Sequence, residues 1–185
     1  MKHSGEASAC LESKSAFGIK LAAGNIFIGE FSNIKNVTYG VIKVGRAYNS
    51  THPSKVRVYL NYRPGSVDFT NNNAPLKKND TDHGQVYIGL VTEPLSLDTS
   101  DAKTLFSPAN YSSKLIAYGE KTLTADYGAD NELLELEVPF EYYEMAKTTK
   151  PMYLVIVACA SKYGDYYAGS SKSVMYVDDF ELVYE

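Results

Sequence analysis

The sequence predicts an all-β protein, a two-sheet β-sandwich with jelly-roll topology. Three observations support this class. Apolar and polar residues alternate along several segments, clusters of Gly, Pro and Asn separate those segments, and the chain carries 16 Tyr and 7 Phe, residue types that favour strands. The chain has 185 residues, of which 44% are hydrophobic and 22% charged. This is enough to bury one sizeable core, so we expect one domain over residues 9–185, with residues 1–8 as an N-terminal tail.

Three segments show the clearest alternation, at residues 55–62, 85–91 and 133–140. Successive side chains of a strand point to opposite faces, so each segment should bury one face and expose the other. The side chains expected to point inward are Val56, Val58, Leu60, Tyr62, Val86, Ile88, Leu90, Leu134, Leu136, Val138 and Phe140.

Less regular strands are expected at residues 25–31, 36–41, 114–118, 153–160 and 174–184. Residues 153–160 are apolar at consecutive positions, which predicts a strand central in its sheet with both faces covered. Helix is scarce, and only residues 100–106 and 139–146 are predicted to form a turn or two.

Composition narrows the functional classes. The net charge is −4 and no run of five like charges occurs, so the sequence gives no basis for nucleic-acid binding. The longest apolar run, Tyr153–Ala160, is far shorter than the roughly 20 residues of a membrane-spanning helix. Residues 1–10 lack the apolar stretch of a secretory signal.

Metal and thiol chemistry are not indicated. The histidines are scattered at positions 3, 52 and 83, without ligand spacing, so we expect no metal site and no cofactor. Cys10 and Cys159 show no Cys-x-x-Cys spacing, which favours two unpaired thiols and leaves a disulfide open. Residues 79–82 (NDTD) resemble the first half of a calcium loop. The loop's last ligand is missing, so a polar turn is favoured and a structural calcium ion stays an alternative.

Catalytic motifs for nucleophilic, phosphate or zinc chemistry are absent. Glu135 and Glu137 share one face of a predicted strand, about 7 Å apart, a separation compatible with the carboxylate pair of a glycoside hydrolase. Asp82 is a further candidate acid. A solvated strand face is the favoured explanation of the two glutamates, with catalysis or a supporting role in ligand binding as alternatives.

Asp178 stands out at the end of the chain. Alternation places it in one row with Tyr176, Phe180 and Leu182, so a carboxylate interrupts an apolar face. A buried carboxylate needs hydrogen bonds or a metal ion. We therefore expect Asp178 to be a structural anchor that accepts loop N–H groups, with a cation or a catalytic role as alternatives.

The outward faces of the predicted strands carry Arg57, Tyr59, Asn61 and Tyr87. If these strands adjoin in one sheet, their side chains form a rigid platform on which a sugar ring stacks while amides and charged groups bind its hydroxyls. An ordinary soluble sheet surface is the alternative.

The C-terminal sequence carries a pattern of its own. Residues 158–185 read ACASKYGDYYAGSSKSVMYVDDFELVYE, with the segments SKYGD, GSSKS and YVDDFEL in order. This ending resembles that of the putative carbohydrate metabolism domain family of Bacteroides-type bacteria. Further segments fit in the same order: AGNIFIG at 23–29, YLNYRPG at 59–65, VYI at 86–88, IAYG at 116–119 and VPFEY at 138–142.

The resemblance implies a jelly-roll module similar to carbohydrate-binding modules, attached to an upstream domain of a longer secreted or cell-surface protein, outer membrane-associated in such bacteria. A polysaccharide or other glycan is then the expected partner. Because the chain has no Trp, Tyr must supply the stacking rings. We add the loop residues Tyr163, Asp165 and Tyr166 to the predicted binding site.

Three functions follow from the sequence. The first is a non-catalytic carbohydrate-binding module. The second is a glycoside hydrolase that uses the paired carboxylates. The third is a structural or adhesin-like module, which should present flat and featureless sheet faces.

Overall fold

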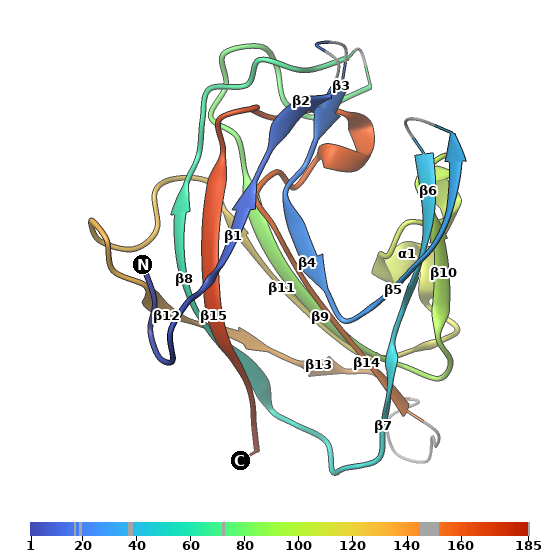
Figure 1. Cartoon of the computed structure of the whole chain (residues 1–185). Helices are drawn as coiled ribbons and strands as arrows, with labels where there is room; N and C mark the ends of the chain where they lie inside the picture. The colour runs from blue at the N-terminus through green and yellow to red at the C-terminus, as the bar shows by residue number, and fades with distance from the viewer. Residues whose placement is uncertain (17, 19, 37–38, 72, 145–151, 185) are drawn as a thin grey trace.

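The computed structural model describes residues 1–185 except 17, 19, 37–38, 72, 145–151 and 185. The predicted all-β fold is confirmed, with two antiparallel sheets packed face to face as a β-sandwich (Figure 1). The jelly-roll order of connections stays a prediction.

The first sheet has four strands. Their order across the sheet is β1 (Ala9–Glu12), β15 (Val174–Val183), β8 (Lys55–Arg63) and β12 (Leu134–Pro139).

The second sheet has six strands. In order across the sheet they are β13 (Glu141–Tyr142), β11 (Leu115–Leu123), β9 (Gly84–Val91), β14 (Met152–Cys159) and β4 (Asn25–Phe27), while β7 (Arg46–Tyr48) pairs with the other end of β14.

Three further strands form a small sheet beside the sandwich, which we call the wing (Figure 1). Its strands are β10 (Leu95–Asp98), β6 (Tyr39–Val44) and β5 (Gly29–Asn36). The remaining elements are a two-stranded ribbon and three short helices: β2 (Lys14–Ala16), β3 (Lys20–Ala22), η1 (Ala102–Thr104), α1 (Pro108–Tyr111) and η3 (Gly164–Tyr166).

The core between the two sheets follows the predicted alternation. The even-numbered side chains of β8 and β9, such as Val58, Leu60 and Ile88, are fully buried in one cluster. Burial of each such side chain contributes about 1.5–3 kcal/mol. One inward prediction is wrong: Leu134 is 42% exposed, and its neighbour Leu133 fills the interior. The reason is that β12 begins only at Leu134, directly after a loop with left-handed backbone at Asn131.

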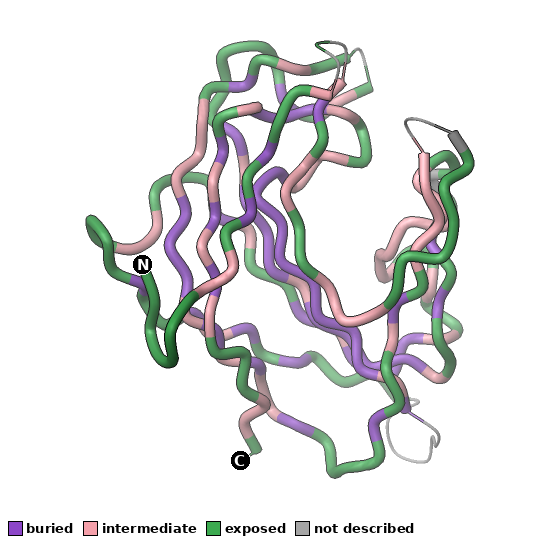
Figure 2. The backbone as a smooth tube through the Cα atoms, in the orientation of Figure 1, coloured by how far each residue is buried: buried purple, intermediate pink, exposed green. Residues whose placement is uncertain are grey.

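The outer face of the second sheet is also apolar. Val91, Val155 and Val157 pack against Val44 and Leu97 of the wing in a second buried cluster. The central strands of the second sheet are accordingly buried over most of their length (Figure 2). The prediction that residues 153–160 form a central strand is thereby confirmed, since β14 lies between β9 and β4 and is buried over most of its length.

The short helices were only partly foreseen. Within residues 100–106, η1 forms as expected. Within residues 139–146, Glu141–Tyr142 instead form strand β13 against β11, and residues 145–146 lie outside the described residues. The helix α1 was missed, although Ser107 caps it by accepting a hydrogen bond from the Asn110 N–H (3.2 Å) and Pro108 occupies its first turn.

Candidate functional site

The predicted platform does not exist as one surface. β8 lies in the first sheet and β9 in the second, so Tyr59 and Tyr87 belong to different layers of the sandwich. Both side chains do point away from the inter-sheet core, as alternation requires. The prediction that Arg57, Tyr59, Asn61 and Tyr87 share one sheet face is wrong, because strand alternation does not determine which strands adjoin.

The outer face of β8 is an ion-pair network. The Arg57 guanidinium lies 3.3 Å from Glu135, 3.5 Å from Glu137 and 3.2 Å from Glu181. Glu137 also pairs with Lys55 at 3.1 Å. The Tyr59 hydroxyl donates to Glu135 (2.9 Å). Each of these three carboxylates therefore has at least one cation as a partner.

The Tyr59 ring is covered. The imidazole of His3 stacks on it with ring centroids 3.4 Å apart and planes 8° from parallel. Asp178 accepts hydrogen bonds from the backbone N–H groups of His3 (2.9 Å) and Ser4 (3.3 Å). Asp178 thus accepts hydrogen bonds from N–H groups as predicted, but it does so on the outer face of the sheet and not in the interior. Met175 and Val177 are the side chains of β15 that point into the core, and the strand bulges after Asp178.

The two glutamates of β12 differ from a hydrolase pair in their electrostatics. The hydrogen bond from Lys55 and the nearby Arg57 lower the pKa of Glu137, although partial burial opposes this. A general acid needs a raised pKa. The arrangement gives no support to catalysis at Glu135 and Glu137.

Asn61 and Asp82 are fully buried and hold loops in place. The Asn61 amide donates to the carbonyls of Ala129 (2.7 Å) and Glu132 (2.8 Å), so Asn61 cannot lie on an open surface. Asp82 accepts hydrogen bonds from the hydroxyls of Ser161 (2.6 Å) and Ser173 (2.7 Å) and from two backbone N–H groups, those of Ser170 and His83 (both 2.8 Å). It lies out of reach of any substrate.

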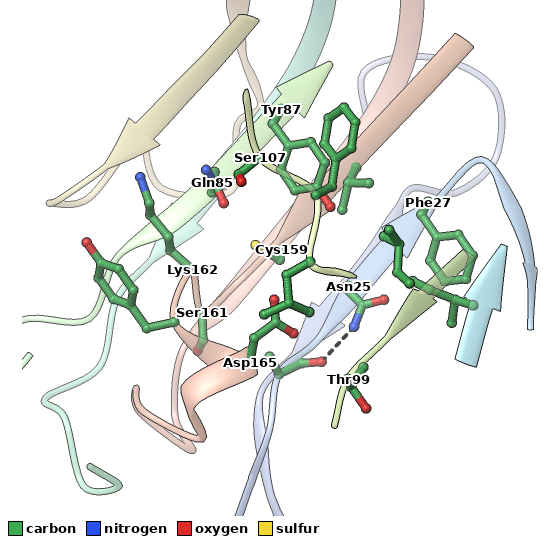
Figure 3. Close-up of a pocket in the computed structure, with 18 of the residues that line it drawn as sticks. Asn25, Phe27, Gln85, Tyr87, Thr99, Ser107, Cys159, Ser161, Lys162 and Asp165 are labelled. Atoms are coloured by element: carbon green, nitrogen blue, oxygen red, sulfur yellow. Dashed lines mark hydrogen bonds between the residues drawn. The ribbon is translucent and has the colours of Figure 1, made fainter. Parts of the chain in front are cut away.

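The main concave site lies on the outer face of the second sheet. A cleft of about 640 Å³ is bounded by β9 and β14 as its floor, by the wing on one side and by the loop around η3 on the other. Figure 3 shows Asn25, Tyr87, Cys159, Lys162 and Asp165 arranged around this space. Of the predicted binding residues, Tyr87, Tyr163, Asp165 and Tyr166 line the cleft, and Arg57, Tyr59 and Asn61 do not.

Aromatic rings line several sides of the cleft. Tyr87 and Phe106 stack with centroids 5.4 Å apart and planes 24° from parallel, and Tyr118 lies 5.9 Å from Phe106. Gly89 makes room for Phe106, since a Cβ at residue 89 would lie 2.8 Å from its ring. At the rim, Phe31 of the wing is 59% exposed and Tyr166 of the η3 loop 42% exposed.

Glu120 is the centre of a polar network in the cleft. It accepts hydrogen bonds from Lys162 (2.9 Å), Tyr118 (2.6 Å) and Gln85 (3.1 Å). Partial burial alone would raise the pKa of Glu120, but the hydrogen bonds from Tyr118 and Lys162 outweigh it and lower the pKa. Glu120 is therefore held as a carboxylate.

Asp165 is the contrasting carboxylate. Its side chain is exposed to the cleft, and the protein packed beneath it removes enough hydration to raise its pKa. None of the described residues forms a hydrogen bond or an ion pair with its carboxylate.

The floor of the cleft carries Cys159, a free thiol. Burial raises the pKa of this thiol to about 12, which keeps it protonated and unreactive.

A cluster of three side chains bridges the two sides of the cleft. The Lys20 ammonium lies over the rings of Tyr39 (4.7 Å) and Tyr167 (4.2 Å), and the two rings meet edge to face at 5.9 Å. Tyr39 directly precedes Gly40 of the wing and Tyr167 directly follows Tyr166, and both of these neighbours line the cleft. We call this cluster the clasp.

Several lining residues escaped the sequence analysis. They are Asn25, Phe27, Phe106, Tyr118, Glu120 and Lys162. Tyr118 and Glu120 alternate on β11 as Gln85 and Tyr87 do on β9, so extending the predicted strand beyond residue 118 would have found them. Phe106 lies in a loop and has no such signal.

Metal and membrane features are limited. Across the described residues, no group of three or more His, Cys, Asp or Glu side chains could hold a metal ion. In the suggested calcium loop, Asp80 accepts the Lys77 N–H (2.7 Å) and Asp82 turns inward. No helix in the described part of the chain is long and apolar enough to cross a membrane.

Comparison with known families decides the relationship. Residues 2–183 match the model of the putative carbohydrate metabolism domain. The chain belongs to this family. The family resemblance inferred from the C-terminal motifs is thereby confirmed, and the chain has a role related to carbohydrate metabolism.

Two crystal structures share the fold of this carbohydrate metabolism domain. Both are described as putative glycoside hydrolases, one from Bacteroides thetaiotaomicron (TM-score 0.69) and one from Bacteroides vulgatus (TM-score 0.67). Each is 24% identical to the chain and matches 96% of it. The matched region is 53% of the first structure and 73% of the second, so the chain spans about half the length of the first. A search of curated proteins found no match.

Proposed function

We propose that this domain binds glycans in the cleft between the wing and the η3 loop, and not on the outer face of β8. The observation that carries the proposal is the combination of exposed rings at the rim, Phe31 and Tyr166, with polar groups deeper inside. The cleft volume of about 640 Å³ falls within the usual range of small-ligand sites, about 300–1,000 Å³.

The chemistry of the lining suits a sugar. An aromatic ring can cover the apolar C–H face of a pyranose, while Gln85, Asn25 and Asp165 offer amide and carboxylate groups to its hydroxyls. Most of these groups lie on strands or on a loop anchored by Asp82, so little ordering entropy is lost on binding. A structural module was expected to present featureless faces, and the cleft speaks against that alternative. A secreted or cell-surface location and an upstream domain remain part of the proposal through the family resemblance.

The experiment is a binding titration against a panel of plant, host and bacterial polysaccharides. Phe31→Ala and Tyr166→Ala should each weaken binding about tenfold, as truncation of aromatic anchors does at other interfaces. Phe180→Ala removes an exposed ring from the first sheet and is the matched control, with no expected effect. If Tyr59→Ala abolishes binding while Phe31→Ala and Tyr166→Ala leave it unchanged, the site lies on the β8 face and the proposal is wrong.

Hydrolysis in the same cleft is a second candidate function. It is favoured by the opposite pKa shifts of Asp165 and Glu120, because glycosidases use one protonated and one ionised carboxyl group. In this candidate Asp165 donates its proton to the glycosidic oxygen as the C–O bond breaks, and Glu120 accepts a proton from the attacking water.

New reducing ends report this reaction. Asp165→Asn should abolish their release, while binding is weakened but still measurable. Asp126→Asn, a change of the same charge on an exposed loop away from the cleft, should retain both release and binding. Recovery of every bound polysaccharide uncut by the wild-type domain would reject hydrolysis and leave the binding function standing.

A further inference from the structure

The charged groups of the cleft are few, and only one of them lacks a partner. Glu120, Lys162 and Asp165 are the charged side chains among its lining residues. The Lys162 ammonium already lies 2.9 Å from Glu120 and donates to the Thr122 hydroxyl (2.8 Å). This pair contributes no net charge to the cleft.

Asp165 is different, because no cation among the described residues pairs with its carboxylate. Loss of hydration is the cause of its raised pKa, and no cation of the described chain offsets it. The groups that face it across the cleft are the protonated Cys159 thiol and the Tyr87 phenol, whose pKa is also raised by burial. When Asp165 is ionised, the cleft therefore holds one negative charge that no described residue compensates.

Such a carboxylate affects ligands in two opposite ways. It accepts hydrogen bonds from hydroxyl groups, and hydrogen bonds to a charged acceptor are about twice as strong as neutral ones. It repels a carboxylate or sulfate on a ligand. Lys162 is already paired with Glu120, so it would have to give up this ion pair to offset the repulsion.

We propose that the cleft selects uncharged glycans over anionic ones, and that Asp165 is the residue that determines this specificity. The inference rests on the proposed glycan-binding function and adds the class of glycan. Neutral hexose or pentose polymers would bind with hydroxyls on Asp165, while polymers rich in uronic acid or sulfate would be rejected.

The size of the discrimination can be estimated. Two unit charges about 6 Å apart at an effective dielectric constant of about 40, between the values for a protein surface and for water, correspond to about a tenfold loss of affinity. Added salt screens this repulsion, so the difference should shrink at high ionic strength.

The test uses matched polysaccharides. Laminarin, xylan, dextran and galactan are each compared with a sulfated preparation of the same polymer. The pH is about 8, roughly four units above the usual pKa of an Asp carboxyl group, which favours ionisation of Asp165 although its pKa is raised. Sulfate keeps its charge at every pH used. We expect each sulfated polymer to bind about tenfold more weakly than its neutral parent, and Asp165→Asn to remove most of this difference. Asp126→Asn, the matched control, should preserve it.

The possible failures are distinguishable. If no polysaccharide binds the wild-type domain, both the glycan-binding function and this inference are rejected. If neutral and sulfated polymers bind equally, or if the preference survives both Asp165→Asn and high salt, glycan binding stands and charge selection by Asp165 is rejected.

Discussion

The Asp82 carboxylate should be one of the largest single contributors to the stability of the protein. It also holds the loop at the edge of the cleft. It is fully buried and accepts four hydrogen bonds, three at one oxygen and one at the other. Two of its donors, Ser161 and Ser170, flank the loop that carries Tyr163, Asp165 and Tyr166. We consider Asp82→Asn, which keeps the shape of the side chain and replaces one oxygen by an NH₂ group.

The expected cost follows from the donors. If the amide oxygen takes the place of the oxygen bonded by Ser161, Ser170 and Ser173, the NH₂ group meets the His83 N–H. A buried donor left without an acceptor costs about 1–3 kcal/mol. The other three hydrogen bonds lose the strengthening that a charged acceptor gives, about 0.5 kcal/mol each. The free energy of unfolding should therefore fall by about 3 kcal/mol.

Urea unfolding measures this change. The midpoint should fall while the slope with denaturant stays constant, since the native fold is kept. Glycan binding should weaken as well, because the η3 loop loses its anchor. Asp126→Asn is the control for the change in charge. A loss of stability below about 0.5 kcal/mol would refute the reasoning, and loss of a glycosidase activity at unchanged stability would instead make Asp82 the catalytic acid considered from the sequence.

Four further predictions concern single residues. Gly89→Ala should displace the Phe106 ring, because the new Cβ would lie 2.8 Å from it. Glycan affinity should fall, and the free energy of unfolding, measured by urea titration, should fall by about 1–3 kcal/mol. Unchanged values of both would show that the floor of the cleft adjusts to the added methyl group. In the native protein an alkylating reagent at about pH 8 should label the exposed Cys10 and spare Cys159, with both labelled after unfolding, as read by mass spectrometry. Burial raises the pKa of Cys159 to about 12, above its value in the unfolded chain, so the free energy of unfolding should fall as the pH rises from about 9 to about 12. Cys159→Ala should make this fall shallower. An equal dependence of the unfolding free energy on pH in the variant and the wild type would contradict the prediction. Arg57→Met should lower the urea midpoint at low salt and less so at high salt, because Glu135, Glu137 and Glu181 lose their shared cation; a loss independent of salt would point to packing instead.

The faces of the strands were readable from the sequence because alternation is a local property. Val58 and Ile88 had to point one way, and Tyr59 and Tyr87 the other. The partners of each strand were not readable, because they are set by contacts between residues far apart in the chain. Tyr59 and Tyr87 have the same local pattern and lie in different sheets.

For the same reason, only some of the residues that line the cleft could be predicted from the sequence. Tyr163, Asp165 and Tyr166 were found through the family motif, and Tyr87 through alternation. The wing was not foreseen, since β10 is only four residues long and lies between loops. Without the wing, the outer face of β9 looks like solvent-exposed surface, and no sequence pattern shows that a cleft forms above it.

The two outer faces of the sandwich differ in whether their carboxylates already have partners. On the first sheet, Arg57 pairs with three glutamates and Tyr59 is covered by His3, so a ligand would have to break existing contacts to bind. In the cleft, Glu120 and Lys162 form an ion pair, and no described residue pairs with the Asp165 carboxylate. Asp165 can therefore accept hydrogen bonds from a ligand without breaking an existing contact, and hydrogen bonds to a charged acceptor are about twice as strong as neutral ones. The cleft face, and not the face with more charged residues, is therefore where binding of a hydroxyl-rich molecule gains the most.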